Sequence, residues 1–177
     1  YSRAPTIPKE NFDRLLAKYT DENFRSNFKY IDSEPFAAAS IGQIHRAELL
    51  DGTKVVIKII KADFEKSFRR DVKRMKRWVR MGLFFNPKLK KVGNPIGLLS
   101  HIEDYTLREL NLLNEIEGKK SLMELADRYS DKFTMPKLKF PKIWEELSNS
   151  QVLVMEEITS PTLESHLNAN TLDWDDL

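Results

Sequence analysis

Three features of the sequence could carry chemistry, and the first is a lysine inside an apolar run. Lys58 is the one residue of the stretch 55–60 that is neither valine nor isoleucine. Such β-branched residues predict a buried strand, where an ammonium group is costly unless it is paired or faces a polar cleft. The alternative is an edge strand whose lysine side chain reaches water. The run alone leaves both interpretations open.

Two glutamates downstream could supply the partner that a buried lysine requires. Glu109 falls on the apolar stripe of a long helix predicted at residues 95–117, so its carboxylate is expected to be partly buried. Glu115 lies one helical turn after Asn111, and the two are expected to share a helix face. Ordinary solvated helix charge is the simpler interpretation of any one glutamate. A buried lysine upstream favours an ion pair.

A run of small residues is the third feature. Ala37, Ala38, Ala39 and Ser40 follow Pro35 and Phe36 and precede a predicted strand. Small side chains let the backbone approach a ligand closely, and main-chain N–H groups exposed in such a loop can cradle phosphate. A tightly packed turn is the alternative interpretation.

Strands must position these groups, and the clearest pair forms a hairpin. Strands are predicted at residues 40–50 and 53–61, on either side of Asp51-Gly52, which is a strong hairpin signal. A two-residue turn and a three-residue bulged turn would place opposite faces of the first strand over the second. A second hairpin is predicted from strands at residues 142–146 and 151–155.

Helices surround the two hairpins. They are predicted at residues 8–19, 63–85, 95–117 and 121–129, with another short helix after 160. Asp63 is the expected N-cap of the second helix, Gly118 the expected end of the third, and Ser121 with Glu124 a capping box for the fourth. The order predicts an α+β fold, in which an antiparallel sheet packs against helices and two long helices form an insert.

Composition excludes several classes of protein. The 177 residues fit one domain. They include no cysteine, so disulfides, a thiol nucleophile and a cysteine-based zinc site are excluded. No apolar run approaches the ~20 residues of a membrane-spanning helix, and no signal peptide is visible. We therefore expect a cytoplasmic or organelle-matrix location, with or without peripheral membrane attachment, and no secretion.

The charge is unevenly distributed along the chain. The net charge is +2, but residues 58–91 hold 13 basic and 3 acidic residues, a local net charge of +10. A basic amphipathic helix attracts anionic lipid at ~1 kcal/mol per nearby Lys or Arg, so the surface from Lys66 to Arg80 could dock on a membrane. A solvated helix face is the alternative interpretation. Nucleic-acid binding is not expected, because no binding motif accompanies the basic stretch.

Four segments together resemble one protein family. Residues 35–47, PFAAASIGQIHRA, closely resemble the alanine-rich loop of the UbiB/AarF atypical kinases, which replaces the glycine-rich loop of most kinases. Residues 55–58 resemble that family's strand lysine, and residues 109–117 its Glu-x-Asp segment and helix-C glutamate. Residues 152–158 resemble the strand that leads into the hinge. The resemblance extends from about residue 7 to residue 163.

The resemblance implies a kinase-like N-lobe that binds ATP or ADP. Lys58 would contact the nucleotide phosphates and pair with Glu115. Glu109 would be the acidic member of the family's inserted motif, and Asn111 stands where the family has aspartate. The other implied nucleotide contacts are the phosphate-side loop Ala37, Ala38, Ala39 and Ser40, the adenine-pocket residues Ile44 and Val56, the gatekeeper Met155, and the hinge backbones of Glu156 and Ile158. Ile44 and Val56 together favour the bulged hairpin.

The resemblance also implies what would lie outside this sequence. The family's Lys-x-Gly-Gln helix would precede Tyr1, and the lobe with the catalytic and metal-binding residues would follow Leu177. No metal ligand is therefore expected here, Mg²⁺ would be held mainly by the other lobe, and this chain alone is expected to transfer no phosphoryl group.

The implied role of the parent protein is isoprenoid-quinone (ubiquinone-type) biosynthesis or related lipid metabolism, with lipids or quinone-pathway proteins as further partners. We expect one domain over residues 1–177. Its expected parts are an N-terminal helical extension (1–27), the loop and first hairpin (28–61), the helical insert and helix C (62–130), and the second hairpin, hinge and start of the C-lobe (131–177).

Overall fold

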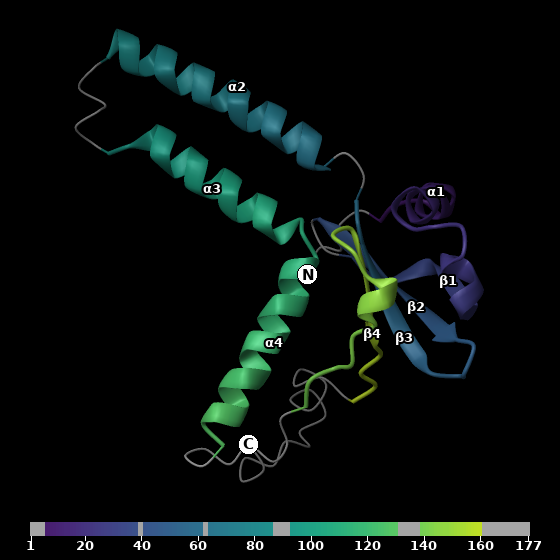
Figure 1. The fold of residues 1–177 in the computed structure, drawn as a ribbon. Helices are drawn as coiled ribbons and strands as arrows, with labels where there is room; N and C mark the ends of the chain where they lie inside the picture. The colour runs from purple at the N-terminus through teal and green to yellow at the C-terminus, as the bar shows by residue number, and fades with distance from the viewer. Residues whose placement is uncertain (1–5, 39–40, 62–63, 87–92, 131–138, 161–177) are drawn as a thin grey trace, which may run out of the picture.

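The computed structural model describes residues 6–38, 41–61, 64–86, 93–130 and 139–160. Its elements are α1 (Lys9–Tyr19), η1 (Phe24–Asn27), β1 (Phe28–Ala38), β2 (Gly42–Leu49), β3 (Lys54–Ile60), α2 (Phe64–Phe85), α3 (Pro95–Glu109), α4 (Leu113–Arg128), η3 (Glu145–Leu147) and β4 (Val152–Glu156). The strands form one antiparallel sheet in the order β1-β2-β3-β4 (Figure 1). The predicted α+β fold with an inserted helical pair is confirmed.

The two faces of the sheet carry different clusters. We call the face of the sheet toward α1 the rear face and the face toward α4 the front face. The rear face packs its buried side chains against α1, where Phe12, Leu15 and Leu16 are almost fully enclosed. The front face carries a smaller cluster in which Ile116 of α4 meets Ile60 of β3. Figure 1 shows α1 and α4 on opposite sides of the sheet. Alternation along β2 and β3 therefore decides whether each side chain enters the main core or the front face.

The turn between β2 and β3 fixes that alternation. The N–H of Leu49 donates to the carbonyl of Thr53 at 2.9 Å, across a three-residue loop that ends in Gly52. Gly52 has φ +88°, the left-handed conformation that such a bulged loop requires and that glycine adopts without strain. The bulged alternative is therefore the one observed, and it places Ile44 directly opposite Lys58.

The first strand of the sheet, β1, was not predicted. It spans 11 residues at the sheet edge, most of them exposed, and it includes Pro35. An edge strand tolerates proline, because one side of its backbone needs no hydrogen-bonding partner. Ala37 and Ala38 belong to the end of this strand rather than to a loop, whereas Ala39 and Ser40 lie outside the described residues.

The single helix predicted at residues 95–117 is wrong: α3 ends at Glu109 and α4 begins at Leu113. Leu110 and Leu112 are both buried in the front cluster between the two helices. The N–H of Leu112 donates to the carbonyl of Ser150, at 3.0 Å, instead of to a helical carbonyl. Burial of two neighbouring leucines on the sheet thus breaks a helix that the sequence pattern alone would continue.

This break overturns four related expectations. Gly118 does not end a helix, and Ser121 with Glu124 forms no capping box, because all three lie inside α4. Asn111 and Glu115 share no helix face, since Asn111 precedes α4. Glu109 is exposed rather than partly buried.

The second predicted hairpin is also largely wrong. Residues 142–146 form no strand; they contribute one bridge, between Ile143 and Met155, and then the η3 turn. The N–H of Trp144 donates to the carbonyl of Val154 at 3.0 Å, so this segment follows β4 for a short distance only. The expected cap Asp63 and the expected helix after residue 160 lie outside the described residues.

The inserted helices α2 and α3 form a hairpin that projects away from the sheet (Figure 1). Lys76 on α2 and Glu103 on α3 join them through a largely enclosed ion pair with an N–O distance of 2.6 Å. The side chain of Asn94 caps α3 by accepting a hydrogen bond from the N–H of Gly97. Of the α2 side chains, Val72 alone is buried, so much of this helix faces solvent.

Candidate functional site

The predicted lysine–glutamate pair is formed. The ammonium group of Lys58 on β3 donates to a carboxylate oxygen of Glu115 in the first turn of α4. The Lys58 side chain is 21% exposed and the Glu115 side chain 41%. Since β3 lies between β2 and β4, Lys58 is not on an edge strand; it faces the open front of the sheet. The edge-strand interpretation is therefore wrong, and Lys58 is a paired lysine on a central strand.

The break between α3 and α4 positions Glu115. Leu112 and Ile116, four residues apart, are both buried in the front cluster, and they fix the first turn of α4 against the sheet. The side-chain oxygen of Asn111 accepts a hydrogen bond from the N–H of Leu113, at 3.2 Å, and so supports the start of α4. Glu115 follows on the same turn and reaches Lys58.

Apolar side chains flank Lys58 on the same face. Ile44 on β2 and Leu153 on β4 stand directly opposite Lys58 across the sheet. In the next row of the ladder Met155 stands opposite Val56. Because paired residues of antiparallel strands share a face, four of the predicted site residues, Lys58, Ile44, Val56 and Met155, come together there. The arrangement places a cation at the edge of an apolar surface that could accept a flat ring.

The strand ends complete the outline of this face. Ala37 pairs with Ile44 and Ala38 with Gln43. Gly42, the first residue of β2, approaches β3 so closely that a side-chain carbon there would lie 2.9 Å from the carbonyl oxygen of Ile59. Glycine is therefore required at this position for the alanine-rich segment to enter the sheet.

The predicted hinge residues lie at the end of β4, with Glu156 as its last residue and Ile158 beyond it. The N–H of Glu156 donates to the carbonyl of Lys142 at 2.9 Å, which leaves the Glu156 carbonyl as the group that could meet a ligand. Ile158 lies two residues beyond and is 64% exposed.

Two residues at this end were not predicted. The Arg46 guanidinium forms an ion pair with Glu157, with an N–O distance of 2.6 Å, and lies 3.8 Å from the ring centroid of Phe36. Arg46 stands opposite Val56, on the same face as Ile44. The two-residue spacing from Ile44 could have indicated this position, but an arginine in a strand suggests only a solvated charge.

The acidic member of the predicted inserted motif stays outside this arrangement. Glu109 ends α3 and is exposed, and the structure does not bring it to the Lys58–Glu115 pair. Asn111 accepts a hydrogen bond from the N–H of Leu113 just before α4, and an aspartate side chain could accept the same bond.

Two further unpredicted residues, Gln43 and His45, lie on the rear face, fully buried and hydrogen-bonded to each other at 2.7 Å. Burial lowers the pKa of His45 below its usual value, against the opposing effect of the Asp32 carbonyl. Both alternate with Ile44 along β2, and this spacing was the signal available in the sequence.

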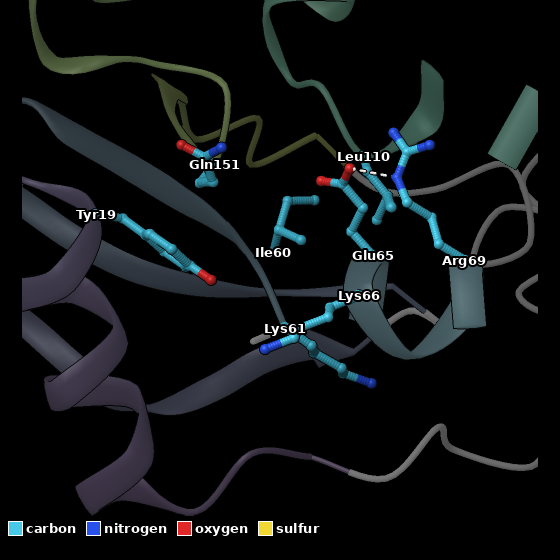
Figure 2. Close-up of a pocket in the computed structure, with 8 residues that line it drawn as sticks. All are labelled: Tyr19, Ile60, Lys61, Glu65, Lys66, Arg69, Leu110 and Gln151. Carbon is cyan, nitrogen blue, oxygen red and sulfur yellow. Dashed lines mark hydrogen bonds and ion pairs between the residues drawn. The ribbon is translucent and has the colours of Figure 1, made fainter. Parts of the chain in front are cut away.

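A separate hollow of about 420 Å³ opens at the end of β3 rather than over Lys58 (Figure 2). Its walls come from the end of α1, the start of α2 and the residues before α4 and β4. Glu65 and Arg69 pair with each other at one side, at 2.9 Å, and the ring of Tyr19 stands at the other. Both charged groups of this pair are more than half exposed, so the hollow is open to solvent on that side.

The described residues contain neither a metal-binding cluster nor a membrane-spanning helix. No group of three or more His, Asp or Glu side chains there could hold a metal ion. Within the same ranges, no helix combines the length and the apolar character needed to cross a bilayer.

A small antiparallel sheet, with a lysine on its third strand paired to a glutamate on a packed helix, is the small lobe of a kinase-like fold. Residues 1–176 match the family described as "ABC1 atypical kinase-like domain". The chain belongs to this family, and several of its relatives are named UbiB.

Curated relatives agree with this assignment. The chain is 30% identical over 182 residues to the probable serine/threonine-protein kinase abkA of Dictyostelium discoideum, covering 97% of this chain and 31% of the relative. It is 28% identical over 153 residues to the probable protein kinase UbiB of Cellvibrio japonicus, covering 85% and 26%. The chain thus spans about a third or less of the length of these relatives.

A solved structure agrees on the fold. The Rv3197–erythromycin complex from Mycobacterium tuberculosis superposes with a TM-score of 0.69, over 93% of this chain and 39% of that chain, at 22% sequence identity. At this identity the likeness supports the fold alone.

Proposed function

We propose that this chain is the nucleotide-binding lobe of a UbiB-like atypical kinase or ATPase, and that its ligand is ATP or ADP. The observation that carries the proposal is the Lys58–Glu115 ion pair on the open face of the sheet. In kinase-like folds a strand lysine meets the α- and β-phosphates and is held by a helix glutamate.

The front face fits such a ligand in two respects. Ile44, Val56 and Met155 form an apolar surface on the same side as Lys58, suited to an adenine ring. At the opposite end the small residues Ala37 and Ala38 lead into Gly42, so that the backbone can come close to phosphate oxygens. Mg²⁺ would accompany the phosphates, with ligands from outside the described residues.

The parent protein is proposed to act in ubiquinone or related lipid metabolism, the role that the resemblance to the UbiB/AarF family implies, and relatives of the chain carry the name UbiB. Phosphoryl transfer depends on metal and catalytic groups as well as on the grip of one lobe. Nucleotide binding is therefore the step that this chain's own residues support.

Binding of nucleotide to the 177-residue chain, followed by calorimetry with ADP and with ATP plus Mg²⁺, tests the proposal. Lys58→Ala should weaken binding at least 10-fold, because it removes the cation from the phosphate end of the face. Lys54→Ala is the matched control, since Lys54 is an exposed lysine on the same strand and the same face. Equal affinity of the wild type and Lys58→Ala would contradict the site.

A second proposal concerns membrane docking by α2, and a specific observation favours it. Trp78, Met81 and Phe85 recur at helical spacing and are 62%, 44% and 78% exposed. The face of α2 that meets α3 carries Val72 and Lys76 instead. Trp78, Met81 and Phe85, called the aromatic stripe after its two aromatic members, therefore point away from α3, and no described element covers them.

The charge of α2 suits an anionic lipid surface. The helix holds 8 basic and 2 acidic residues, and Arg74 and Arg77 lie beside the aromatic stripe on the wheel of 100° per residue. Aromatic side chains that enter the interface and cations that meet headgroups are the pattern of an interfacial helix. We propose peripheral docking on a membrane that contains anionic lipid.

Co-sedimentation with vesicles of phosphatidylcholine alone, or with 3:1 phosphatidylcholine and phosphatidylserine, tests this docking. The chain should pellet with the anionic vesicles only, and Trp78→Ala with Phe85→Ala should reduce the bound fraction severalfold. Tyr30→Ala is the control, because Tyr30 is an exposed aromatic on β1. Binding that ignores lipid charge, or that survives loss of the stripe, would contradict the proposal.

A further inference from the structure

A continuous series of hydrogen bonds, called the relay below, lies on the rear face of the sheet, behind the front face that carries Lys58. The N–H of Ile7, ahead of α1, donates to the side-chain oxygen of Gln43 at 2.8 Å. The side-chain nitrogen of Gln43 lies 2.7 Å from Nε2 of His45, and Nδ1 of His45 lies 2.8 Å from the carbonyl oxygen of Asp32 on β1. The relay therefore joins three segments: the residues before α1, strand β1 and strand β2.

The chemistry of the end groups sets the direction of each bond. The Asp32 carbonyl can only accept, so Nδ1 of His45 carries the proton and donates. A neutral His45 then presents Nε2 as an acceptor, and the amide nitrogen of Gln43 donates to it. The Gln43 oxygen remains free to accept from Ile7. Every polar atom of the relay is satisfied in this one arrangement.

The relay is well enclosed. Gln43 and His45 are both 0% exposed, and the ring of Phe12 on α1 stacks on the His45 imidazole at a centroid distance of 3.6 Å. A buried polar group that loses its hydrogen-bond partner is destabilising. Breaking one link therefore leaves a polar atom of Gln43 or His45 without its partner inside the core.

The position of the relay links it to the front face. Gln43 and His45 are the two neighbours of Ile44 on β2, and Ile44 stands directly opposite Lys58. We propose that Gln43 and His45 are positioning residues, whose relay couples the segment ahead of α1 to the placement of Ile44 against Lys58. Opening of the relay then shifts β2 and weakens nucleotide binding; this last step rests on the proposed function.

Protonation of His45 would open the relay. A charged imidazole is a donor at both nitrogens, so Nε2–H would meet the amide nitrogen of Gln43. Rotating the Gln43 amide by 180° would satisfy His45 but would point the amide N–H groups at the N–H of Ile7. The charged groups that face His45, Asp32 and Glu34 on β1 and Asp13 on α1, favour the cation, and burial opposes it.

The variant Gln43→Glu separates this relay from simple packing. A carboxylate of the same shape accepts from both Ile7 and a protonated His45, so the variant relay is intact when His45 is charged. In the wild type, the protection factor of the Ile7 amide, which is the intrinsic exchange rate at each pH divided by the observed rate, should fall and ADP should bind more weakly as the pH falls from 8 to 5.5. In Gln43→Glu both quantities should change in the opposite direction. Gln151→Glu, the same change outside the relay, should follow the wild type.

Two measurements distinguish a failure of the proposed coupling from a failure of the proposed nucleotide binding. The amide resonances of Ile44 and Lys58, recorded without nucleotide, report the coupling directly and should shift as the Ile7 amide is released. If the wild type binds no ADP, the proposed function fails and these resonances alone decide the coupling. Unchanged Ile44 and Lys58 resonances during release of Ile7 would overturn the inference.

A second pair of variants covers the case in which Gln43→Glu does not fold. Ile7→Pro removes the donor N–H together with the isoleucine side chain, whereas Ile7→Ala removes most of the side chain and keeps the N–H. Ile7→Pro should shift the Ile44 and Lys58 resonances and weaken ADP binding about 3-fold more than Ile7→Ala does. Identical effects of the two changes would contradict a role for the hydrogen bond.

Discussion

The two faces of the sheet are built for different purposes. On the rear face the side chains of β2, β3 and β4 are fully buried against α1, and the polar pair Gln43–His45 is completely hydrogen-bonded. On the front face Lys58 and Glu115 stay partly exposed beside a smaller apolar cluster. The comparison indicates that packing on the rear face supplies most of the stability. The front face carries the charged groups of Lys58 and Glu115 on the sheet that this packing stabilises.

The largest expected effect breaks the rear face. Leu16→Ala removes a fully enclosed side chain of α1, and the cavity left behind should lower the free energy of unfolding by about 2–5 kcal/mol. Urea denaturation measures this change. Leu50→Ala, at a 70% exposed leucine in the β2–β3 turn, should change stability by less than about 0.5 kcal/mol, and equal losses would contradict the proposed division between the faces.

The pH dependence of stability tests the buried histidine. Burial lowers the pKa of His45 in the folded chain, so the unfolded chain binds the proton more tightly. Stability should be complete above about pH 6.5, the ordinary histidine value. It should decline below that pH, by at most about 1.4 kcal/mol per pH unit, until the folded pKa is reached.

The measurement is urea denaturation between pH 8 and pH 5, with histidine variants compared. His45→Asn should flatten the decline below pH 6.5 although the variant is less stable overall. His101→Asn, at an exposed histidine on α3, should retain the wild-type slope. A wild-type slope in His45→Asn would show that another group causes the decline.

A smaller effect is expected on the helix that carries Glu115. Gly118 lies inside α4, is exposed, and has open space where a side-chain carbon would stand. Gly118→Ala should therefore stabilise the chain by about 0.5–1 kcal/mol, because alanine loses less backbone entropy in a helix. Thermal unfolding should show a higher midpoint. Gly52→Ala should instead destabilise, since Gly52 has a positive φ.

The smallest expected effect on stability is at the ion pair itself. Lys58→Met keeps the length of the side chain and removes its charge, and a partly exposed pair is screened by solvent. The free energy of unfolding should change by about 0–1 kcal/mol, whereas nucleotide binding should fall as for Lys58→Ala. A loss of several kcal/mol would mean that the front-face charge is structural, and the contrast between the faces would disappear.

Prediction from the sequence succeeded where local patterns decide the structure. The valine and isoleucine run of β3, the Asp51-Gly52 turn and the α2 helix follow from strand periodicity, turn chemistry and helical periodicity. Prediction failed for β1, because an exposed edge strand buries few side chains and so shows little alternation. It also failed at Leu110–Leu112, where helical spacing continues but the chain turns to bury both leucines.

The candidate site divides along the same line. A lysine among β-branched residues, and the small residues after Pro35, are visible in the sequence, because each is unusual among its own neighbours. The Glu115 partner of that lysine was predicted through the family resemblance rather than from local pattern. The bonds that join Gln43 to Ile7 and His45 to Asp32, and the Arg46–Glu157 pair, depend on segments far apart in the chain. Only the tertiary structure decides these pairings, since a hydrogen bond or an ion pair exists only when folding brings its two groups together.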